Sequence, residues 1–295
     1  MTWLVTGAGG MLGTDLLARL RGGAVAPKRG ELDVTDASAV REALRRHRPA
    51  AVLNCAAWTA VDDAETREDE ALAVNGTAVA ALAEGCAEIG AALVHLSTDY
   101  VFAGTGTEPY PEDHPTDPVN AYGRTKLAGE RAVLAYERGY VVRTAWLYGA
   151  HGPNFVQAMV RLAAERETVD VVDDQTGQPT WTGDLADRVA ALAARAASGA
   201  APPGIYHGTS AGRTTWYGLA REVFTLLGLD PGRVRPTTSD RFVRPAARPA
   251  FSVLGHARWA EAGLEPMRDW REALHAAWPC LQVPAQGGSP GGSPP

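Results

Sequence analysis

The feature that most constrains the fold of this chain is a set of three glycines close to its start. A short apolar run is followed by Gly7, Gly10 and Gly13, and a helical pattern then runs from Thr14 to Leu20. Glycines in such a turn let the backbone bend sharply, approach a pyrophosphate closely and pack a helix on its strand. The spacing is a variant of GxGxxG and predicts a dinucleotide site at the helix N-terminus. A strand-to-helix turn without a ligand is the alternative.

Apolar strands alternate with alanine-rich amphipathic helices along the chain, an order typical of βαβ units. This alternation predicts an α/β fold of the Rossmann type, a doubly wound parallel sheet that binds ligands at the carboxyl ends of its strands. The expected strands are 3–6, 24–26, 51–54, 92–97, 140–144 and 169–172. The expected helices are 11–21, 37–47, 68–88, 121–136 and 154–166, with Gly90 and Gly139 as stop signals.

A chain of 295 residues is long enough for a large nucleotide-binding domain and a smaller C-terminal substrate-binding domain. We expect the first over residues 1–150, with later segments returning to it, and the second mainly over 151–283. Residues 284–295 are almost wholly Pro, Gly, Ser and Gln, which predicts a disordered tail.

The composition indicates a soluble cytoplasmic protein. A formal net charge of -6 offers no basic surface for nucleic acid or anionic lipid. No uninterrupted apolar run approaches bilayer thickness, and the first residues already form a strand and phosphate turn, so we expect neither a membrane span nor a signal peptide. Cys55, Cys86 and Cys280 are scattered without metal-ligand spacing, which is typical of reduced thiols and predicts no metal.

Tyr122 and Lys126 are the most informative candidates for chemistry. If their segment is helical, residues four apart lie on one face, so the ammonium can sit beside the phenol. A nearby cation favours the phenolate and would lower the tyrosine pKa towards the range useful for a general acid or base. Alone, such a pair also occurs by chance on exposed helices.

The end of the second expected strand favours NADPH as cofactor, with NADH possible. Enzymes selective for NAD usually place Asp or Glu there to bind the ribose 2′-hydroxyl. Here Pro27-Lys28-Arg29 follows, and Arg29 or Lys28 can pair with a 2′-phosphate. Alternatively these are solvated loop charges that Glu31 offsets.

The next segment, 32–36, resembles the loop that carries an adenine-contacting aspartate, which would put Asp33 and Val34 beside the base. As an alternative, Asp33 or Thr35 caps the helix that follows.

Four segments, 53–62, 96–102, 122–130 and 143–149, resemble in order and spacing the extended short-chain dehydrogenase/reductases. The likeness is closest to the dTDP-4-dehydrorhamnose reductase family, and further matches extend it from residue 2 to about residue 278. It implies that a nicotinamide cofactor reduces the 4-keto group of a thymidine-diphosphate (dTDP)-linked 6-deoxyhexose, the substrate and expected partner.

The resemblance implies catalytic roles for Thr98, Tyr122 and Lys126. The Thr98 hydroxyl would hydrogen-bond the substrate carbonyl, and Tyr122 would protonate that oxygen as hydride arrives. Lys126 would hold the cofactor ribose and keep the phenol acidic. Ser97 is a rival for the hydroxyl role, because neighbours on a strand face opposite sides.

The glycine pattern and the resemblance together predict two binding sets. The expected cofactor residues are Gly7, Gly10, Met11, Leu12, Gly13, Arg29, Asp33, Val34, Ala56, Ala57, Trp58, Thr59, Tyr122 and Lys126. The expected substrate residues are Val61, Thr98, Asp99, Tyr122, Trp146 and Arg248. Alternatively Asp99 is a turn residue, Trp146 is a core residue, and Arg248 belongs with Arg241 and Arg244 to a basic surface loop.

Other functions remain open. Another short-chain enzyme, an epimerase or a dehydratase, would retain Tyr122 and Lys126, but a dehydratase usually has Asp-Glu after the threonine, whereas Thr98 precedes Asp99-Tyr100. A non-catalytic regulatory subunit of this fold is a third alternative. We expect a monomer or homodimer. Residues 179–183 lack the acid through which some relatives bind a metal across a dimer contact.

Overall fold

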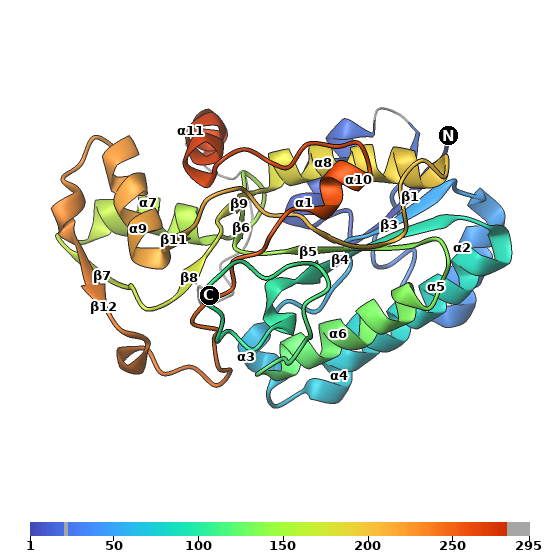
Figure 1. Ribbon diagram of the computed structural model, residues 1–295, viewed down its shortest axis with the longest axis horizontal. Coiled ribbons are helices and arrows are strands. Elements are labelled where there is room, and N and C mark those ends of the chain that lie inside the picture. Colours follow the sequence, from blue (N-terminus) through green and yellow to red (C-terminus); the bar gives the residue numbers. More distant parts are fainter. Residues whose placement is uncertain (21–22, 282–295) are drawn as a thin grey trace.

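The computed structural model describes residues 1–20 and 23–281, so the expected disordered tail lies outside the described residues. A six-stranded sheet forms the centre, in the order β10-β5-β4-β3-β1-β2, and every pair in it is parallel (Figure 1). The predicted α/β fold of the Rossmann type is therefore confirmed. Its strands are β1 (Trp3–Thr6), β2 (Ala24–Val25), β3 (Ala51–Asn54), β4 (Ala92–Thr98), β5 (Gly139–Thr144) and β10 (Gly204–His207).

Helices cover both faces of the sheet, because successive side chains of each strand point to opposite sides and both sides are apolar. Leu4 packs in one core and its neighbour Val5 in the other. In Figure 1 one helical layer lies above the sheet and the other below it. The upper layer holds α1 (Met11–Arg19), α8 (Thr182–Ala197) and α10 (Arg258–Glu261). The lower layer holds α2 (Ala37–His47), α5 (Ala78–Ile89) and α6 (Ala121–Leu134).

A second, smaller lobe has its own hydrophobic core and lies on the left of Figure 1. Its larger elements are α7 (Phe155–Glu165), β7 (Val169–Val172), α9 (Trp216–Leu226), β12 (Val234–Thr237) and α11 (Trp270–Leu281). Two pairs of short strands lie beside it: β6 (Leu147–Tyr148) with β9 (Thr180–Trp181), and β8 (Thr176–Gly177) with β11 (Thr214–Thr215).

The expected strand 169–172 forms, but the prediction that it belongs to the central sheet was wrong. β7 pairs with β12 in this lobe rather than with the central sheet. Val169 and Val171 are buried while Asp170 is exposed, the alternation of a strand covered on one side only. The sixth place in the sheet belongs to β10, from beyond residue 150, which sequence reasoning did not predict.

The expected helix 68–88 is interrupted. It consists of α4 (Glu68–Leu72), a π-helical turn η1 (Ala73–Thr77) and α5. Within the π turn the Asn75 side chain accepts from the Trp58 backbone N–H (2.9 Å) and donates to the Thr125 hydroxyl (3.1 Å). The extra residue of a π turn thus points Asn75 at the loop after β3. The remaining short helices are α3 (Val61–Ala64), η2 (Asp99–Val101), η3 (Pro231–Arg233) and η4 (Ser239–Arg241).

Of the expected helix signals, Gly90 is confirmed, whereas Gly139 and the expected cap residues of α2 are not. Gly90 does end α5 in the left-handed region, at φ 72°. Gly139 is no helix stop: α6 ends at Leu134, and Gly139 opens β5, where a Cβ would collide with the Val133 carbonyl. The cap of α2 is Asp36, which accepts from Ser38 and Ala39, so neither Asp33 nor Thr35 caps this helix.

Among the described residues one helical stretch, Glu68–Ile89, has the length and composition of a membrane span, with 22 residues and a mean hydropathy of 1.2. Nearly half of its apolar window, 44%, is buried inside the protein. Core helices of globular proteins meet the same criteria, so this stretch is weak evidence for a membrane.

Candidate active site

The turn from β1 into α1 requires its glycines. Gly7 has φ 66°, and a Cβ on it would collide with the Ala56 backbone. A Cβ on Gly13 would collide with the Gly7 carbonyl, so the third glycine lets α1 pack against the turn. The cap residue Gly10 has no side chain to satisfy the first helical N–H groups, and the first turn has no acidic residue. Free N–H groups at a helix N-terminus form an anion site, so this cradle fits a pyrophosphate.

The loop after β2 carries Lys28 and Arg29, the residues expected to contact a 2′-phosphate. The side chain of Arg29 is exposed, and the Glu31 carboxylate accepts from the Lys28 backbone N–H (2.8 Å). Asp33 accepts from the Thr35 N–H (3.0 Å) and hydroxyl (2.8 Å), and these hydrogen bonds lower the pKa of its carboxyl group. Asp33 is therefore charged and held by the loop itself.

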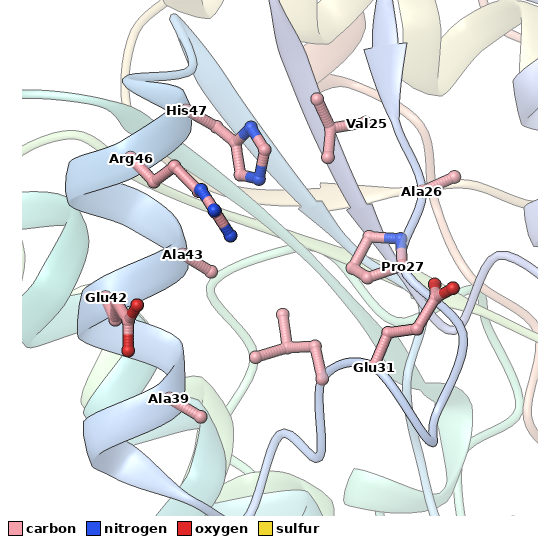
Figure 2. A pocket seen from close by; sticks show the side chains of 10 residues that line it. Val25, Ala26, Pro27, Glu31, Ala39, Glu42, Ala43, Arg46 and His47 are labelled. Carbon is pink, nitrogen blue, oxygen red and sulfur yellow. The ribbon is translucent and has the colours of Figure 1, made fainter.

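A cavity of about 440 Å³ lies behind this loop, between the end of β2 and α2 (Figure 2). Pro27 and Glu31 line one wall, and Arg46 and His47 point into it from the last turn of α2. Arg29 is not among its lining residues. The cavity therefore separates the basic loop from the basic end of α2.

The residues after β3 are fixed by contacts on both sides. The Ala56 backbone lies against Gly7, as described, and the Trp58 backbone is bound by Asn75. The Trp58 indole donates to the Ala60 carbonyl (3.0 Å) and lies under the Arg67 guanidinium, 4.7 Å from the ring centre. Ala56 thus lies beside the glycine turn, and Trp58, two residues further on, is held by Asn75.

Thr98 lies at the carboxyl end of β4, where the parallel register sets it opposite Thr144 of β5. Its hydroxyl donates to Asp99 Oδ1 (3.0 Å) and accepts from the Tyr100 N–H (3.2 Å). Burial raises the pKa of Asp99 to about 6. Asp99 Oδ2 is buried without a hydrogen bond of good geometry, although the nearby Ser252 hydroxyl acts against burial to lower the pKa of Asp99. An unsatisfied buried oxygen of this kind calls for a ligand. Ser97, the other candidate for the hydroxyl role, does not contact Asp99 or Tyr100; its hydroxyl donates to Glu130 (2.6 Å).

Tyr122 lies in the first turn of α6, which Asn120 caps by accepting from the Gly123 N–H (2.8 Å). Its ring packs edge to face against Tyr100, at 5.9 Å between ring centres. The expected lowering of its pKa by Lys126 is wrong for this structure. Burial and the Asp99 charge raise the pKa of Tyr122, and a hydrogen bond with Thr98 opposes them. Tyr122 is therefore a protonated phenol at neutral pH.

Lys126 is buried one turn further along α6. Its Nζ donates to the Leu96 carbonyl (2.6 Å) and lies 3.4 Å from His95 Nε2. Burial lowers the pKa of Lys126 to about 8, although the Glu130 charge opposes this shift. The side chain is thus held beneath β4 by backbone and histidine contacts.

A cavity of about 670 Å³ opens between the two lobes, beside Tyr100. Val61 and Arg248, two of the expected substrate residues, line it together with Trp216 and Phe155 from the smaller lobe. Trp146 does not line it. Instead its ring stacks face to face on Trp216, with 3.6 Å between ring centres and 8° between planes. Trp146 is half-buried in a left-handed backbone conformation, at φ 45°.

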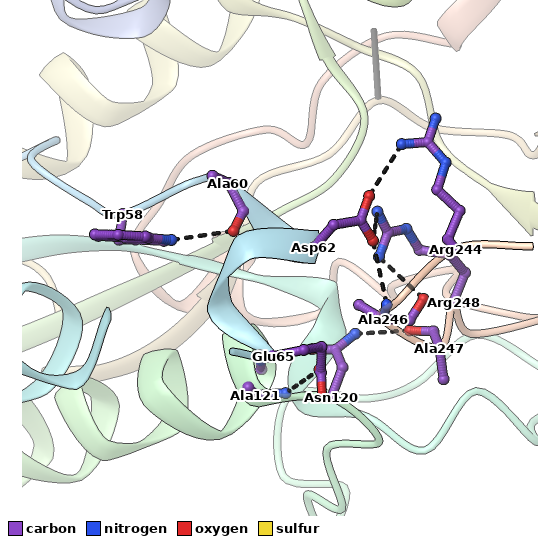
Figure 3. A network of polar contacts seen from close by, with 11 residues as sticks. Trp58, Ala60, Asp62, Glu65, Asn120, Ala121, Arg244, Ala246, Ala247 and Arg248 are labelled. Atoms are coloured by element: carbon purple, nitrogen blue, oxygen red, sulfur yellow. Dashed lines mark hydrogen bonds and ion pairs between the residues drawn. The ribbon is translucent and has the colours of Figure 1, made fainter. Parts of the chain in front are cut away.

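The Asp62 carboxylate, in the larger lobe, is bound by residues 244–248 at the rim of this cavity (Figure 3). Asp62 of α3 contacts Arg244 through Oδ2 (3.0 Å) and Arg248 through Oδ1 (3.1 Å), and it accepts from the Ala246 N–H (3.2 Å). Burial raises the pKa of Asp62, but these hydrogen bonds and charges outweigh it and lower the pKa overall. The Arg248 guanidinium lies 5.9 Å from the centre of the Tyr100 ring. Two arginines therefore share one anion at the cavity.

Sequence reasoning missed several of these residues. Asn75 takes its place through neighbours distant in sequence, so no local pattern marks it, whereas Tyr100 and Trp216 lie in matched segments but were given no role. Asp62 was seen only as part of a matched segment. In the described residues no group of three or more His, Cys, Asp or Glu side chains is placed to hold a metal.

The strand order, the glycine cradle and the tyrosine and lysine one turn apart define a Rossmann-type enzyme of the extended short-chain dehydrogenase/reductase class. Residues 1–282 match the family model described as the RmlD substrate binding domain, and the chain belongs to this family. The expected resemblance to dTDP-4-dehydrorhamnose reductases is thereby confirmed.

Curated relatives and solved structures agree. The chain is 62% identical over 284 residues to the dTDP-4-dehydrorhamnose reductase of Streptomyces griseus, covering 95% of this chain and 93% of the relative. It is 57% identical to the dTDP-4-keto-6-deoxy-D-glucose reductase of Streptomyces niveus, covering 95% and 98%. The structure of the Bacillus anthracis dTDP-4-dehydrorhamnose reductase, in complex with NADP, superposes with a TM-score of 0.89 at 35% identity and covers 94% and 99%.

Proposed function

We propose that this protein is an NADPH-dependent reductase of the 4-keto group of a dTDP-linked 6-deoxyhexose, acting in activated deoxysugar biosynthesis. The observation that carries the proposal is the cluster of Thr98, Asp99 and Tyr122, which contacts Tyr100 in the wall of the interlobe cavity. It places a protonated phenol, a hydroxyl and an unsatisfied carboxylate oxygen together. The names of the relatives support the same activity.

The cradle of Gly7, Gly10 and Gly13 would hold the pyrophosphate of NADPH, and Lys126 would hold the adjacent ribose. When bound, the cofactor supplies a hydride to the carbonyl carbon. The chain supplies the proton: Tyr122 gives its phenolic hydrogen to the carbonyl oxygen, while the single hydroxyl hydrogen of Thr98 would turn from Asp99 to that oxygen. Because the pKa of Tyr122 is raised, the proton is present at neutral pH.

Arg29 is proposed to bind the 2′-phosphate that distinguishes NADPH from NADH. Arg29→Ala should raise the KM for NADPH by roughly ten- to a hundredfold and that for NADH little, because loss of a charge-assisted contact costs about 1.5–3 kcal/mol. Arg46→Ala is the matched control, since it removes the same charge behind the loop. Steady-state kinetics with both cofactors tests this. Equal effects of Arg29→Ala on the two would remove Arg29 from the site.

Arg248 is proposed to bind the diphosphate of the substrate, because it lines the cavity and its guanidinium suits bidentate recognition. Arg248→Ala should weaken thymidine diphosphate binding more than tenfold and leave NADPH affinity unchanged. Arg241→Ala is the control, because Arg241 is exposed and does not line the cavity. Calorimetry measures both affinities. Unaltered thymidine diphosphate binding by the Arg248 variant would rule out the assignment.

The activity itself is tested with a panel of dTDP-4-keto-6-deoxyhexoses and NADPH, following loss of NADPH absorbance and the stereochemistry of the product. We expect one member to be reduced with stoichiometric consumption of NADPH. Binding of a partner enzyme without NADPH consumption by any member would instead identify a regulatory subunit.

We also propose a cytoplasmic enzyme that is a monomer or homodimer. The acidic composition supports this location, and Cys55, Cys86 and Cys280 are all free thiols.

A further inference from the structure

A row of buried polar groups connects the end of β1 with Lys126. The parallel register places Thr6 of β1 opposite Asn54 of β3, and Asn54 opposite His95 of β4. The Thr6 hydroxyl donates to Asn54 Oδ1 (2.6 Å), Asn54 Nδ2 lies 2.9 Å from His95 Nδ1, and His95 Nε2 lies 3.4 Å from Lys126 Nζ. All four side chains are buried.

A backbone group fixes the orientation of the Asn54 amide. The Ala56 N–H lies 3.2 Å from Asn54 Oδ1. Because a backbone N–H can only donate, the oxygen of the amide must face Ala56 and its NH₂ group must face His95. The amide therefore donates to His95 Nδ1.

That hydrogen bond decides where His95 carries its proton. Burial and the neighbouring Lys126 charge lower the pKa of His95 well below its usual range, so the ring is neutral and has one N–H. Since Nδ1 accepts from Asn54, the proton is on Nε2. A Cβ on Gly129 would lie 3.3 Å from this nitrogen, so the glycine keeps α6 close to the ring.

The His95 Nε2–H therefore faces the Lys126 nitrogen. An ammonium has three donors and no acceptor, whereas a neutral amine has a lone pair that accepts a hydrogen bond. The histidine N–H thus favours the amine form. The Leu96 carbonyl accepts from Nζ in either form.

We propose that Asn54 and His95 are positioning residues that set the proton balance of Lys126, through a histidine tautomer fixed by the Ala56 backbone. The catalytic consequence rests on the proposed function. After Tyr122 gives its proton to the substrate oxygen, the Lys126 ammonium releases one proton to restore the phenol, and solvent returns that proton to Lys126 in each turnover. The ammonium becomes an amine, which the His95 N–H stabilises, and the phenolate becomes a phenol.

The other groups near Lys126 are accounted for. Glu130, one turn further along α6, favours the ammonium, but its carboxylate is already bound by Arg143 and Ser97. Burial raises the pKa of Cys55, at the end of β3, to about 12, so this thiol is neutral. Tyr122, one turn earlier, is a neutral phenol.

The sequence makes a direct test simple, because its only lysines are Lys28 and Lys126. In Lys28→Arg protein labelled with ¹³C-lysine, the single side-chain ε resonance reports the titration of Lys126. Asn54→Asp reverses the tautomer: the carboxylate must accept from His95 Nδ1, and Nε2 then accepts from the ammonium. We expect the Lys126 pKa, near 8 before this change, to rise by about one to three units, the range for a favourable charged neighbour.

The matched control separates the tautomer from the added charge. The same Asn54→Asp change in a His95→Phe background retains the carboxylate but removes the imidazole, and we expect less than half of the shift. An equal shift in both backgrounds would overturn the proposal, because the carboxylate would then act through space alone.

A second measurement can be made on the native protein, and this part of it does not depend on any Asn54 variant folding. Long-range ¹H–¹⁵N spectra identify the protonated nitrogen of His95, assigned by the signal that His95→Phe loses. We expect the proton on Nε2 in the native protein and on Nδ1 in Asn54→Asp. A native proton on Nδ1 would refute the proposal. Neither experiment needs turnover, so failure of the reductase assignment, seen as an unreduced substrate panel, is distinguishable from failure here.

Discussion

Tyr122→Phe should lower turnover by roughly two to four orders of magnitude, the usual contribution of a positioned proton donor. NADPH binding should stay nearly intact, because the phenyl ring keeps its packing against Tyr100. The variant loses only the hydroxyl that carries the proton to the substrate oxygen. Single-turnover rates at saturating substrate, together with NADPH affinity from fluorescence titration, provide the measurement.

Tyr136→Phe is the control for that variant. Tyr136 lies just beyond the end of α6, and its hydroxyl donates to the Ala91 carbonyl (2.8 Å). Tyr136→Phe therefore removes the same kind of hydroxyl group at the end of α6 opposite to Thr98. Turnover should be unchanged in this control. If Tyr122→Phe also turned over at the native rate, another group would have to supply the proton.

The second large effect concerns the buried ion pair of Arg143 on β5 with Glu130 on α6. Two hydrogen bonds of 2.9 and 2.7 Å join them, and their side chains are only 2% and 1% exposed. Glu130→Gln leaves the guanidinium buried without a counter-charge. Breaking such a pair from one side costs about 3–5 kcal/mol, so the free energy of unfolding should fall by that amount in urea denaturation.

An exposed pair supplies the comparison. Arg41 and Glu84 are 2.8 Å apart, with the carboxylate side chain 64% exposed. Glu84→Gln should change the free energy of unfolding by less than about 1 kcal/mol, because solvent already screens the charges. A loss of similar size in Glu130→Gln would mean that water or a rearranged side chain compensates Arg143.

Much of the first lobe was predictable from local sequence. The bounds of β1, α2 and β3 match the expected ranges, because fully buried strands are apolar runs and α2 is strongly amphipathic. β10 and the position of β7 were not predictable, since the strand that completes a sheet depends on pairing with β5 across the chain. The π turn likewise depends on Asn75 finding the loop after β3.

In the candidate site, too, some features could be predicted from local sequence and others could not. Tyr122 and Lys126 are marked by their spacing on one helix, and Thr98 by its place in a matched segment at the end of a strand. The electrostatics were not predictable: the expected acidic phenol requires a lysine in contact, whereas Lys126 binds Leu96 and His95 instead. Asp62 and Arg244, 182 positions apart, meet only in the folded chain.

The return of β10, α8 and α10 to the first lobe limits how the two lobes can move. After β5 the backbone crosses between them repeatedly, at β6, at the start of α8, before β11 and on both sides of α10. A hinge in which one lobe swings about a single connection would have to bend all of these crossings together. Access to the interlobe cavity is therefore left to segments anchored at both ends, such as residues 238–249, which Asp62, Asn120 and Asp174 hold through ion pairs and hydrogen bonds.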